Sequence, residues 1–244
     1  MMKVAVVSDI HANRHAFEAV LDSVSESQAG ELWCLGDVVG YGAEPGACVE
    51  LAREHAAICL AGNHDLAVTG ELELDEFSTG ARIAAEWTRE VLDPEHASFL
   101  AKLAPSGRER GVALYHASPR DPVWEYVTSA LQADLCMDVQ AERVSFIGHT
   151  HIALAYQRPE TSSATGDRRE DGEILDLSRD QWLINPGSVG QPRDNDPRAA
   201  WLELDLELMT ARFHRVDYDI QGAAGAIRAA RLPDALAERL EHGC

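Results

Sequence analysis

The chain has 244 residues, of which 45% are hydrophobic, and 41 acidic against 21 basic residues give a formal net charge of -20. This length allows one sizeable core, so residues 1–244 are expected to form a single domain. The charge argues against long nucleic acid as a partner, because duplex binding depends on cationic side chains that neutralise phosphates. A small phosphorylated substrate stays open, since bound cations reverse the local potential.

The chain carries no apolar run near the ~20 residues that a membrane span needs, and its first apolar run is too short for a signal peptide. Five cysteines follow no paired spacing: Cys34, Cys48, Cys59, Cys136 and Cys244. We therefore expect a cytoplasmic protein with reduced cysteines and no membrane partner. A redox or zinc-finger role for the cysteines is the alternative. The sequence does not decide between a monomer and a homo-oligomer.

Strands and helices alternate in the first part of the chain. Apolar runs at 4–7, 32–35 and 58–61 predict buried strands, and the spacing of Phe17, Val20, Leu21 and Val24 predicts a helix between the first two. Residues 44–56 predict a second helix, with Pro45 near its start, where proline is tolerated. This alternation predicts parallel pairing, and ligands bind such sheets at the carboxyl ends of the strands.

The rest of the chain predicts further helices and strands. Residues 66–105 are expected to form a helical insert that either caps the functional site or packs over the sheet. The expected elements that follow are strands at 112–115 and 144–147, a helix at 127–139, an exposed loop or hairpin at 159–180, strands at 182–184, 200–206 and 209–216, and a helical tail from 219.

Short polar fragments follow the strand-like runs. They are Asp9-Ile10-His11, Gly36-Asp37, Gly62-Asn63-His64-Asp65, His116 and Gly148-His149-Thr150-His151. Asp9 and His11 lie two positions apart, so their side chains point the same way if the segment is extended. The fragments supply carboxylate, imidazole and amide groups without a thiolate. This mixture suits Mn²⁺, Fe²⁺, Co²⁺, Ni²⁺ or Zn²⁺, whereas Ca²⁺ prefers a cage of oxygen atoms.

This series of fragments resembles the calcineurin-like metallophosphoesterases, in particular their small bacterial and archaeal phosphodiesterase branch. A later stretch, Asn185-Pro186-Gly187-Ser188, resembles a turn of the same branch that lies near the Gly-His-Thr-His loop. The resemblance implies an α/β fold that is a four-layer αββα sandwich, in which two mixed β-sheets lie face to face with helices outside.

The resemblance also implies a role for each motif residue. One metal ion would be held by Asp9, His11 and His151, and a second by Asn63, His116 and His149. Asp37 would bridge the two ions, and His64 would donate a proton to the leaving oxygen without binding metal. Mn²⁺ is the preferred metal, with Fe, Ni, Co or Zn as alternatives. Two such ions supply hydroxide near neutral pH and offset charge on the phosphoryl group.

The expected activity is hydrolysis of small or nucleotide-like phosphodiesters, with a metal-bridging hydroxide as nucleophile. Ser/Thr protein phosphatases and symmetrical dinucleoside tetraphosphatases carry Arg-Gly shortly after the Gly-Asp motif, whereas the segment from Gly36 to Gly42 contains no arginine. Those branches also have Gly-Asn-His-Glu, whereas this chain has Asp65 in place of the Glu. Both departures argue against those branches. The alternatives are a phosphomonoesterase that acts on a phosphoprotein or a metabolite, a metal-dependent sensor, and a scaffold without catalysis.

Substrate-binding residues are not assigned by the sequence. Asn13 and Arg14 either contact phosphate or begin a helix, and Arg120 and Arg193 are either phosphate clamps or solvated side chains. Asp65 either orients His64 or caps a turn. The turn that begins at Asn185 either binds an anion through its amides or has a structural role, which is the preferred interpretation.

Overall fold

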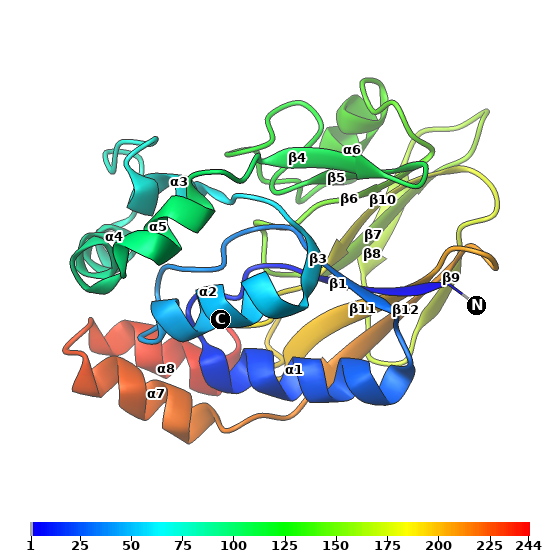
Figure 1. Ribbon diagram of the computed structural model, residues 1–244. Coiled ribbons are helices and arrows are strands. Elements are labelled where there is room, and N and C mark those ends of the chain that lie inside the picture. Colours follow the sequence, from blue (N-terminus) through cyan, green and yellow to red (C-terminus); the bar gives the residue numbers. More distant parts are fainter. Residues whose placement is uncertain (1) are drawn as a thin grey trace.

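The computed structural model describes residues 2–244 as two six-stranded sheets that lie face to face, with helices outside them (Figure 1). The first sheet contains β1 (Lys3–Val7), β2 (Glu31–Cys34), β3 (Ala56–Cys59), β9 (Ile174–Asp176), β11 (Ala199–Asp205) and β12 (Thr210–Val216). The second contains β4 (Ser106–Glu109), β5 (Val112–Tyr115), β6 (Val144–Phe146), β7 (Ala153–Arg158), β8 (Thr165–Arg168) and β10 (Gln181–Pro186). The helices are α1 (Arg14–Ser27), α2 (Pro45–His55), α3 (Asn63–Thr69), α4 (Thr79–Val91), α5 (Pro94–Leu100), α6 (Ala130–Met137), α7 (Ile220–Ala229) and α8 (Asp234–His242).

Both sheets are mixed. The first has the order β3-β2-β1-β11-β12-β9, and β1, β2 and β3 are parallel, as the alternation of strands and helices predicts. The second has the order β4-β5-β6-β10-β7-β8, and β5, β6 and β10 are its parallel strands. The parallel strands of each sheet therefore bring their carboxyl ends, and the polar fragments that follow them, to one edge.

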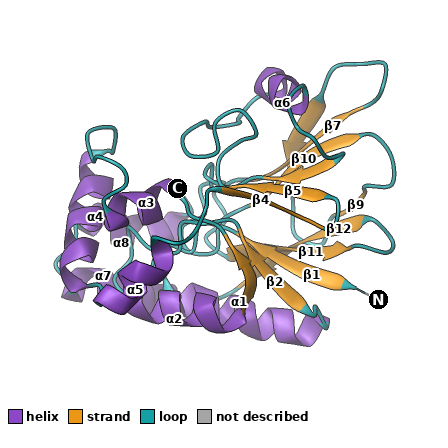
Figure 2. Ribbon diagram, turned by 45° about the horizontal axis from the view of Figure 1, so that its top comes forward, coloured by secondary structure: helices purple, strands orange, loops and turns teal. Residues whose placement is uncertain are grey.

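The two faces of β1 belong to different cores. Val4 and Val6 pack between the two sheets with Trp33 and Phe146, whereas Val7 packs beneath α1 and α2 with residues such as Phe17. This division follows from the period of two along a strand. On the far side, α6 covers the second sheet, where Met137 packs with Leu183. The resulting order of helix, sheet, sheet and helix confirms the predicted four-layer sandwich (Figure 2).

A group of helices lies beyond the strand ends. Helices α3, α4, α5, α7 and α8 gather on the left-hand side of Figure 1. An apolar cluster joins α4 to the two C-terminal helices, and Ala84, Ile227 and Leu236 are among its buried members. The predicted tail helix is thus confirmed as α7 and α8. The single-domain organisation and the role of stretch 66–105 stay predictions.

The polar stretch 159–180 differs in part from the expected loop or hairpin. Its first half does form a hairpin, in which β8 pairs with β7. Its second half contains β9, which crosses to the first sheet and pairs with β12. Both are edge strands with little burial, so they lack the apolar alternation from which a strand is recognised. Within residues 2–244, the helices are too short or too polar to cross a membrane.

Candidate metal centre

Every polar fragment singled out in the sequence lies at the same edge, beyond the carboxyl ends of parallel strands. Asp9 and His11 follow β1, Asp37 follows β2, Asn63 and His64 form the first turn of α3 after β3, His116 follows β5, and His149 and His151 follow β6. The exposed fraction of each of these side chains is 3% or less. The structure therefore gathers the predicted residues from both sheets into one buried cluster.

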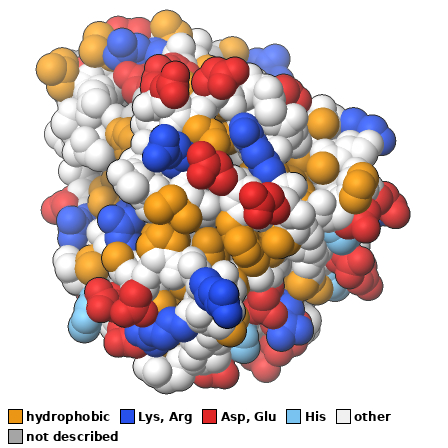
Figure 3. All heavy atoms as spheres, turned by 90° about the vertical axis from the view of Figure 1, so that its left-hand side faces the viewer, with side chains coloured by type: hydrophobic (Ala, Val, Ile, Leu, Met, Phe, Trp, Pro, Cys, Tyr) orange, Lys and Arg blue, Asp and Glu red, His pale blue; other side chains and the backbone are white. Residues whose placement is uncertain are grey.

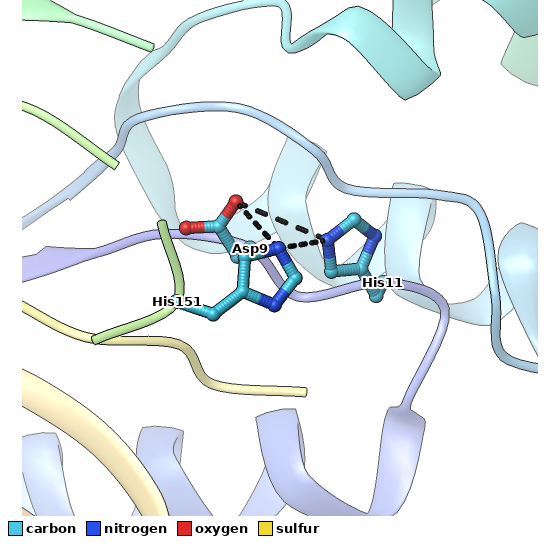
Figure 4. Close-up of side chains that lie close together, drawn as sticks. All are labelled: Asp9, His11 and His151. Carbon is cyan, nitrogen blue, oxygen red and sulfur yellow. Dashed lines mark hydrogen bonds and ion pairs between the residues drawn. The ribbon is translucent and has the colours of Figure 1, made fainter. Parts of the chain in front are cut away.

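Asp9, His11 and His151 form one set of candidate ligands (Figure 4). Their ligand atoms all lie within 4.8 Å of one another. The Nε2 atoms of the two histidines are 3.1 Å apart, and Oδ1 of Asp9 is 3.5 Å from Nε2 of His151 and 3.9 Å from that of His11. One carboxylate and two imidazoles at such distances fit a single transition-metal ion.

Asp37, His116 and His149 form a second set, again with ligand atoms within 4.8 Å of one another. Oδ1 of Asn63 lies 3.2 Å from Nε2 of His116 and adds an amide oxygen to this set. Oδ2 of Asp37 lies 3.5 Å from Nε2 of His116 and also 3.5 Å from Nε2 of His11. The Asp37 carboxylate therefore stands between the two sets.

The orientation of three imidazoles is fixed by backbone carbonyl groups. Nδ1 of His11 donates to the carbonyl of Val39 at 3.1 Å, Nδ1 of His116 to that of Leu35 at 3.0 Å, and Nδ1 of His151 to that of Gln191 at 2.7 Å. A carbonyl only accepts, so Nδ1 carries the proton and each neutral ring presents its Nε2 lone pair to the centre. Two such lone pairs face each other at 3.1 Å between His11 and His151, an arrangement that a bound cation would stabilise.

Burial shifts the pKa values of the cluster toward neutral side chains. It raises the pKa of Asp9 from 3.8 to about 7, and it raises that of Asp37 well above its ordinary value, with the neighbouring Asp65 charge adding to the effect. Burial likewise lowers the pKa of His116 and takes those of His11, His149 and His151 well below 6.5. Neutral imidazoles are the form that binds metal.

Three buried side-chain atoms of the cluster have no hydrogen-bond partner within residues 2–244. They are Oδ2 of Asp37 in the middle of the centre, Nε2 of His149 in the second set, and Nδ1 of His64. A buried polar atom without a partner costs free energy unless a ligand satisfies it. Oδ2 of Asp37 and Nε2 of His149 carry lone pairs and come from the same set of candidate ligands, so these two atoms fit a bound cation.

The ligand loops have strained backbones, and this corrects one sequence argument. Asp9 and His11 have φ of 56° and 50°, so the segment is not extended as assumed. Their side chains converge although each of these two residues has a left-handed backbone conformation. Asp37 (55°), His149 (65°) and His151 (60°) share this conformation, which costs of order 1–3 kcal/mol per non-glycine residue and persists only where the surroundings impose it.

Gly62 and Asp65 hold the loop after β2, which carries Asp37, against the start of α3. A Cβ at Gly62 would collide with the Asp37 carboxylate, so only glycine allows this close approach. Asp65 accepts hydrogen bonds from the backbone amides of Gly62 (2.9 Å), Val38 (3.2 Å) and Val39 (3.1 Å). Asp65 therefore caps the start of α3 rather than a following turn, and it ties that start to the loop that carries Asp37.

The Asn185 turn is structural. Asn185 Nδ2 donates to the carbonyl of Gly148 at 2.6 Å and to Thr150 Oγ1 at 2.9 Å, and Ser188 Oγ donates to the carbonyl of Asp9 at 2.8 Å. The turn therefore braces the loops that carry Asp9, His149 and His151, as its preferred interpretation expected.

Of the candidate phosphate contacts, only Arg193 lines the cavity at the centre. Asn13 caps α1 through Ala16 N at 3.1 Å, and Arg14 pairs with Glu44 at 2.8 Å. Arg120 pairs with Glu125 at 3.3 Å and does not line this cavity. Arg193 lines it, and its buried Nε has no hydrogen-bond partner within residues 2–244.

The cavity has a volume of about 310 Å³ and is lined by side chains that the sequence did not single out. These are Tyr41, Glu76, Phe77, Ser78, Trp124, Tyr126 and Arg239. They lie in loops and on α8, where no motif or periodicity marks them. Only their positions in three dimensions show that they belong to the site.

The buried carboxylates and imidazoles could hold metal ions, and comparison with known families shows which class of protein carries them. The pattern of the calcineurin-like phosphoesterase superfamily domain matches residues 2–207. The chain therefore belongs to this superfamily, which confirms the resemblance seen in the sequence, and it is a phosphoric ester hydrolase.

Two relatives show how far the similarity extends. The chain is 39% identical over 244 residues to the uncharacterized protein MJ0912 of Methanocaldococcus jannaschii, covering 97% of this chain and 96% of that protein. It is 27% identical over 220 residues to phosphodiesterase YfcE of Escherichia coli strain K12, covering 86% of this chain and 91% of that protein.

Solved structures agree on the fold. The metallophosphoesterase of Sphaerobacter thermophilus is 40% identical and superposes with a TM-score of 0.91, covering 100% of this chain and 99% of that one. Hypothetical protein PH1004 of Pyrococcus horikoshii OT3 is 18% identical, with a TM-score of 0.79 and the same coverage, and shares the fold.

Proposed function

We propose that the chain is a dinuclear metal-dependent phosphodiesterase that acts on small or nucleotide-like phosphodiesters. Asp9, His11 and His151 hold one divalent ion, and Asn63, His116 and His149 hold the second. Asp37 belongs to both sites. The observation that carries the proposal is the buried Oδ2 of Asp37, which lies 3.5 Å from one histidine of each set and has no hydrogen-bond partner within residues 2–244.

Two bound divalent ions, with Mn²⁺ preferred, would lower the pKa of a water molecule and neutralise charge on the phosphoryl oxygens. The chain supplies a rigid frame for them. Backbone carbonyls fix the rings of His11, His116 and His151, and the amide of His64 donates to Oδ1 of Asp37 at 2.8 Å, which leaves Oδ2 for the centre. Such fixed orientation of ligands raises metal affinity.

His64 is the proposed proton donor to the leaving oxygen. Burial, with the Arg193 charge adding to it, lowers the pKa of His64 to about 3, so the ring is neutral before substrate binds. An anionic phosphodiester beside the ring raises this pKa toward the value that general-acid catalysis needs. A ligand role is the competing hypothesis, because His64 lies with His11 and Asp37 in a third set of close ligand atoms.

Arg193 is the proposed anchor for the substrate phosphate. Its guanidinium lies 5.6 Å from the ring centroid of Tyr41 and donates to Gln191 Oε1 at 2.9 Å, which holds it at the cavity. Its positive charge also lowers the pKa values of Asp9, Asp37 and His64. The remaining guanidinium N–H groups suit an anionic phosphate oxygen.

The diester preference is tested by comparing two chromogenic esters that share one leaving group. Metal-stripped protein supplied with Mn²⁺ is assayed with bis-p-nitrophenyl phosphate and with p-nitrophenyl phosphate. The proposal predicts a higher kcat/KM for the diester. Faster hydrolysis of the monoester would replace the proposal with a phosphomonoesterase, for which the relative named phosphodiesterase YfcE gives no support.

A further inference from the structure

Three aromatic side chains that are not candidate metal ligands wall the cavity at the metal centre. Phe77 lies in the segment between α3 and α4, and Trp124 and Tyr126 lie in the loop between β5 and α6. On the molecular face where α3, α4 and α8 gather, hydrophobic side chains collect near the middle with charged groups around them (Figure 3). The proposed ligands and the proton donor do not require any of these three rings.

The rings contact two histidines of the cluster, and the Trp124 centroid lies 6.5 Å from that of His149. The centroid of Phe77 lies 5.0 Å from that of His64 and 5.1 Å from that of Trp124, both in edge-on geometry. At the other end, the Tyr126 ring lies 4.0 Å from the His149 ring. The aromatic wall thus begins at the proposed proton donor and ends at a proposed metal ligand.

The loop that carries Trp124 is held in place by its own hydrogen bonds. Asp121 Oδ1 accepts from the amides of Val123 at 3.0 Å and Trp124 at 3.1 Å. Ser118 Oγ donates to Glu125 Oε2 at 2.5 Å, and Gln132 donates to the carbonyl of Tyr126 at 2.9 Å. Binding of a ligand to this wall therefore costs little conformational entropy, because the loop is already ordered.

The wall has the chemistry of a site for a flat ring. Phe77 and Trp124 are half-buried and Tyr126 is 46% exposed, so ring surface is left to a ligand. Aromatic faces bind nucleobases by stacking, whatever the base. The cavity volume of about 310 Å³ is at the small end for ligand sites, which suits one nucleotide unit rather than a polymer.

We propose that Phe77 and Trp124 are specificity-determining residues that bind the nucleobase of a nucleotide-type phosphodiester. The inference rests on the proposed function for the position of the phosphate at the metal centre. The Phe77 ring lies 5.0 Å from that of His64, and the Trp124 ring lies 6.5 Å from that of His149, so a base on these rings stays within one nucleotide of a phosphate at the metal centre. Stretch 66–105 then takes part in substrate selection, because it supplies Phe77.

The test compares two phosphates that differ only in the base. Binding of AMP and of ribose 5-phosphate to the Mn²⁺-loaded chain is measured by calorimetry. One stacked base is expected to tighten binding by about 5- to 100-fold. The preference for AMP should fall toward unity in a Phe77→Leu, Trp124→Leu double variant and should largely persist in Trp124→Phe. Phe99→Leu is the matched control, because Phe99 lies on α5, packs at the edge of the core beside Arg53 of α2, and does not line the cavity.

Equal affinity for the two phosphates, or no binding of either, overturns the inference. Equal loss of both affinities in the double variant also overturns it, since a structural role would act on the phosphate as much as on the base. Phenyl phosphate that binds tighter than AMP would replace the nucleobase with an aryl group attached directly to the phosphate. Hydrolysis of bis-p-nitrophenyl phosphate by the same preparation separates these outcomes from failure of the proposed function.

Discussion

Substitution of Asp37 by asparagine is predicted to uncouple folding from metal binding. Asparagine keeps an oxygen that accepts the His64 amide hydrogen bond, now 2.8 Å long, and it has nearly the same shape. It loses the charge at Oδ2, which is buried with 1% of the side chain exposed. The metal-free variant should therefore be at least as stable as the wild type, because burial disfavours the ionised form of Asp37 and an amide avoids this cost.

The loss appears when metal is added. An ion that binds only the folded chain stabilises it by about 2.7 kcal/mol at a free concentration of 100 Kd. For a chain of this size, 1 kcal/mol shifts Tm by about 2–4 °C, so each ion is worth about 5–11 °C. Oδ2 of Asp37 is 3.5 Å from a histidine of each set, and its charge therefore contributes to both sites. The assay is the Mn²⁺-induced Tm shift, measured for both proteins after treatment with a chelator.

We expect a large Mn²⁺-induced Tm shift for the wild type and a small one for Asp37→Asn, together with loss of turnover. Glu203→Gln is a useful control, because Glu203 pairs with Lys3 at 3.0 Å far from the centre. A variant that keeps the full Tm shift and two bound ions would refute the bridging role of Asp37.

Three further predictions concern single residues. His64→Ala should retain both metal ions and lose most rate with poor leaving groups; an equal loss for good and poor leaving groups would remove His64 as the general acid. Arg193→Gln should lower kcat/KM by about 10- to 150-fold, the range for a charged hydrogen bond, while Arg53→Gln, which loses a surface pair with Glu95, should have no effect. In metal-free protein, the pKa of Asp9 is about 7 in the folded state, against an ordinary value of 3.8 in the unfolded state. Between these two pH values the folded state binds more protons than the unfolded state, so the Asp9 contribution to stability is lost as pH rises. The stability of Asp9→Asn relative to the wild type should therefore grow from about pH 4 to about pH 7, by up to about 4 kcal/mol, in denaturant titrations with chelator; no growth over this range would contradict the buried pKa.

The sequence predicted the candidate ligands because their chemistry is local. Each lies directly after an apolar run, and parallel strands bring their carboxyl ends to one edge, so Asp9, Asp37 and Asn63 had to lie near one another. The pairing of these loops with His116 and His149 of the second sheet rested on the family resemblance. The structure brings the two groups together across the interface between the sheets.

Other features were out of reach because they depend on tertiary contacts. The left-handed backbone at Asp9 and His11 carries no sequence signal, and the extended geometry assumed for them was wrong. Strand β9 has mostly exposed residues, so the crossing of the chain to the first sheet showed no periodicity. In the sequence, Phe77 and Trp124 are aromatic residues of loops without any motif. Only the contact of Phe77 with His64, and of Trp124 with Phe77, identifies them as walls of the cavity.

The most direct test of the proposed function is a Mn²⁺ titration of metal-stripped protein, with bis-p-nitrophenyl phosphate hydrolysis and bound metal measured on the same samples. We expect no turnover without metal and full turnover as bound Mn²⁺ approaches two ions per chain. Folded protein that binds no Mn²⁺, or that hydrolyses no phosphoester with any divalent metal, would contradict it.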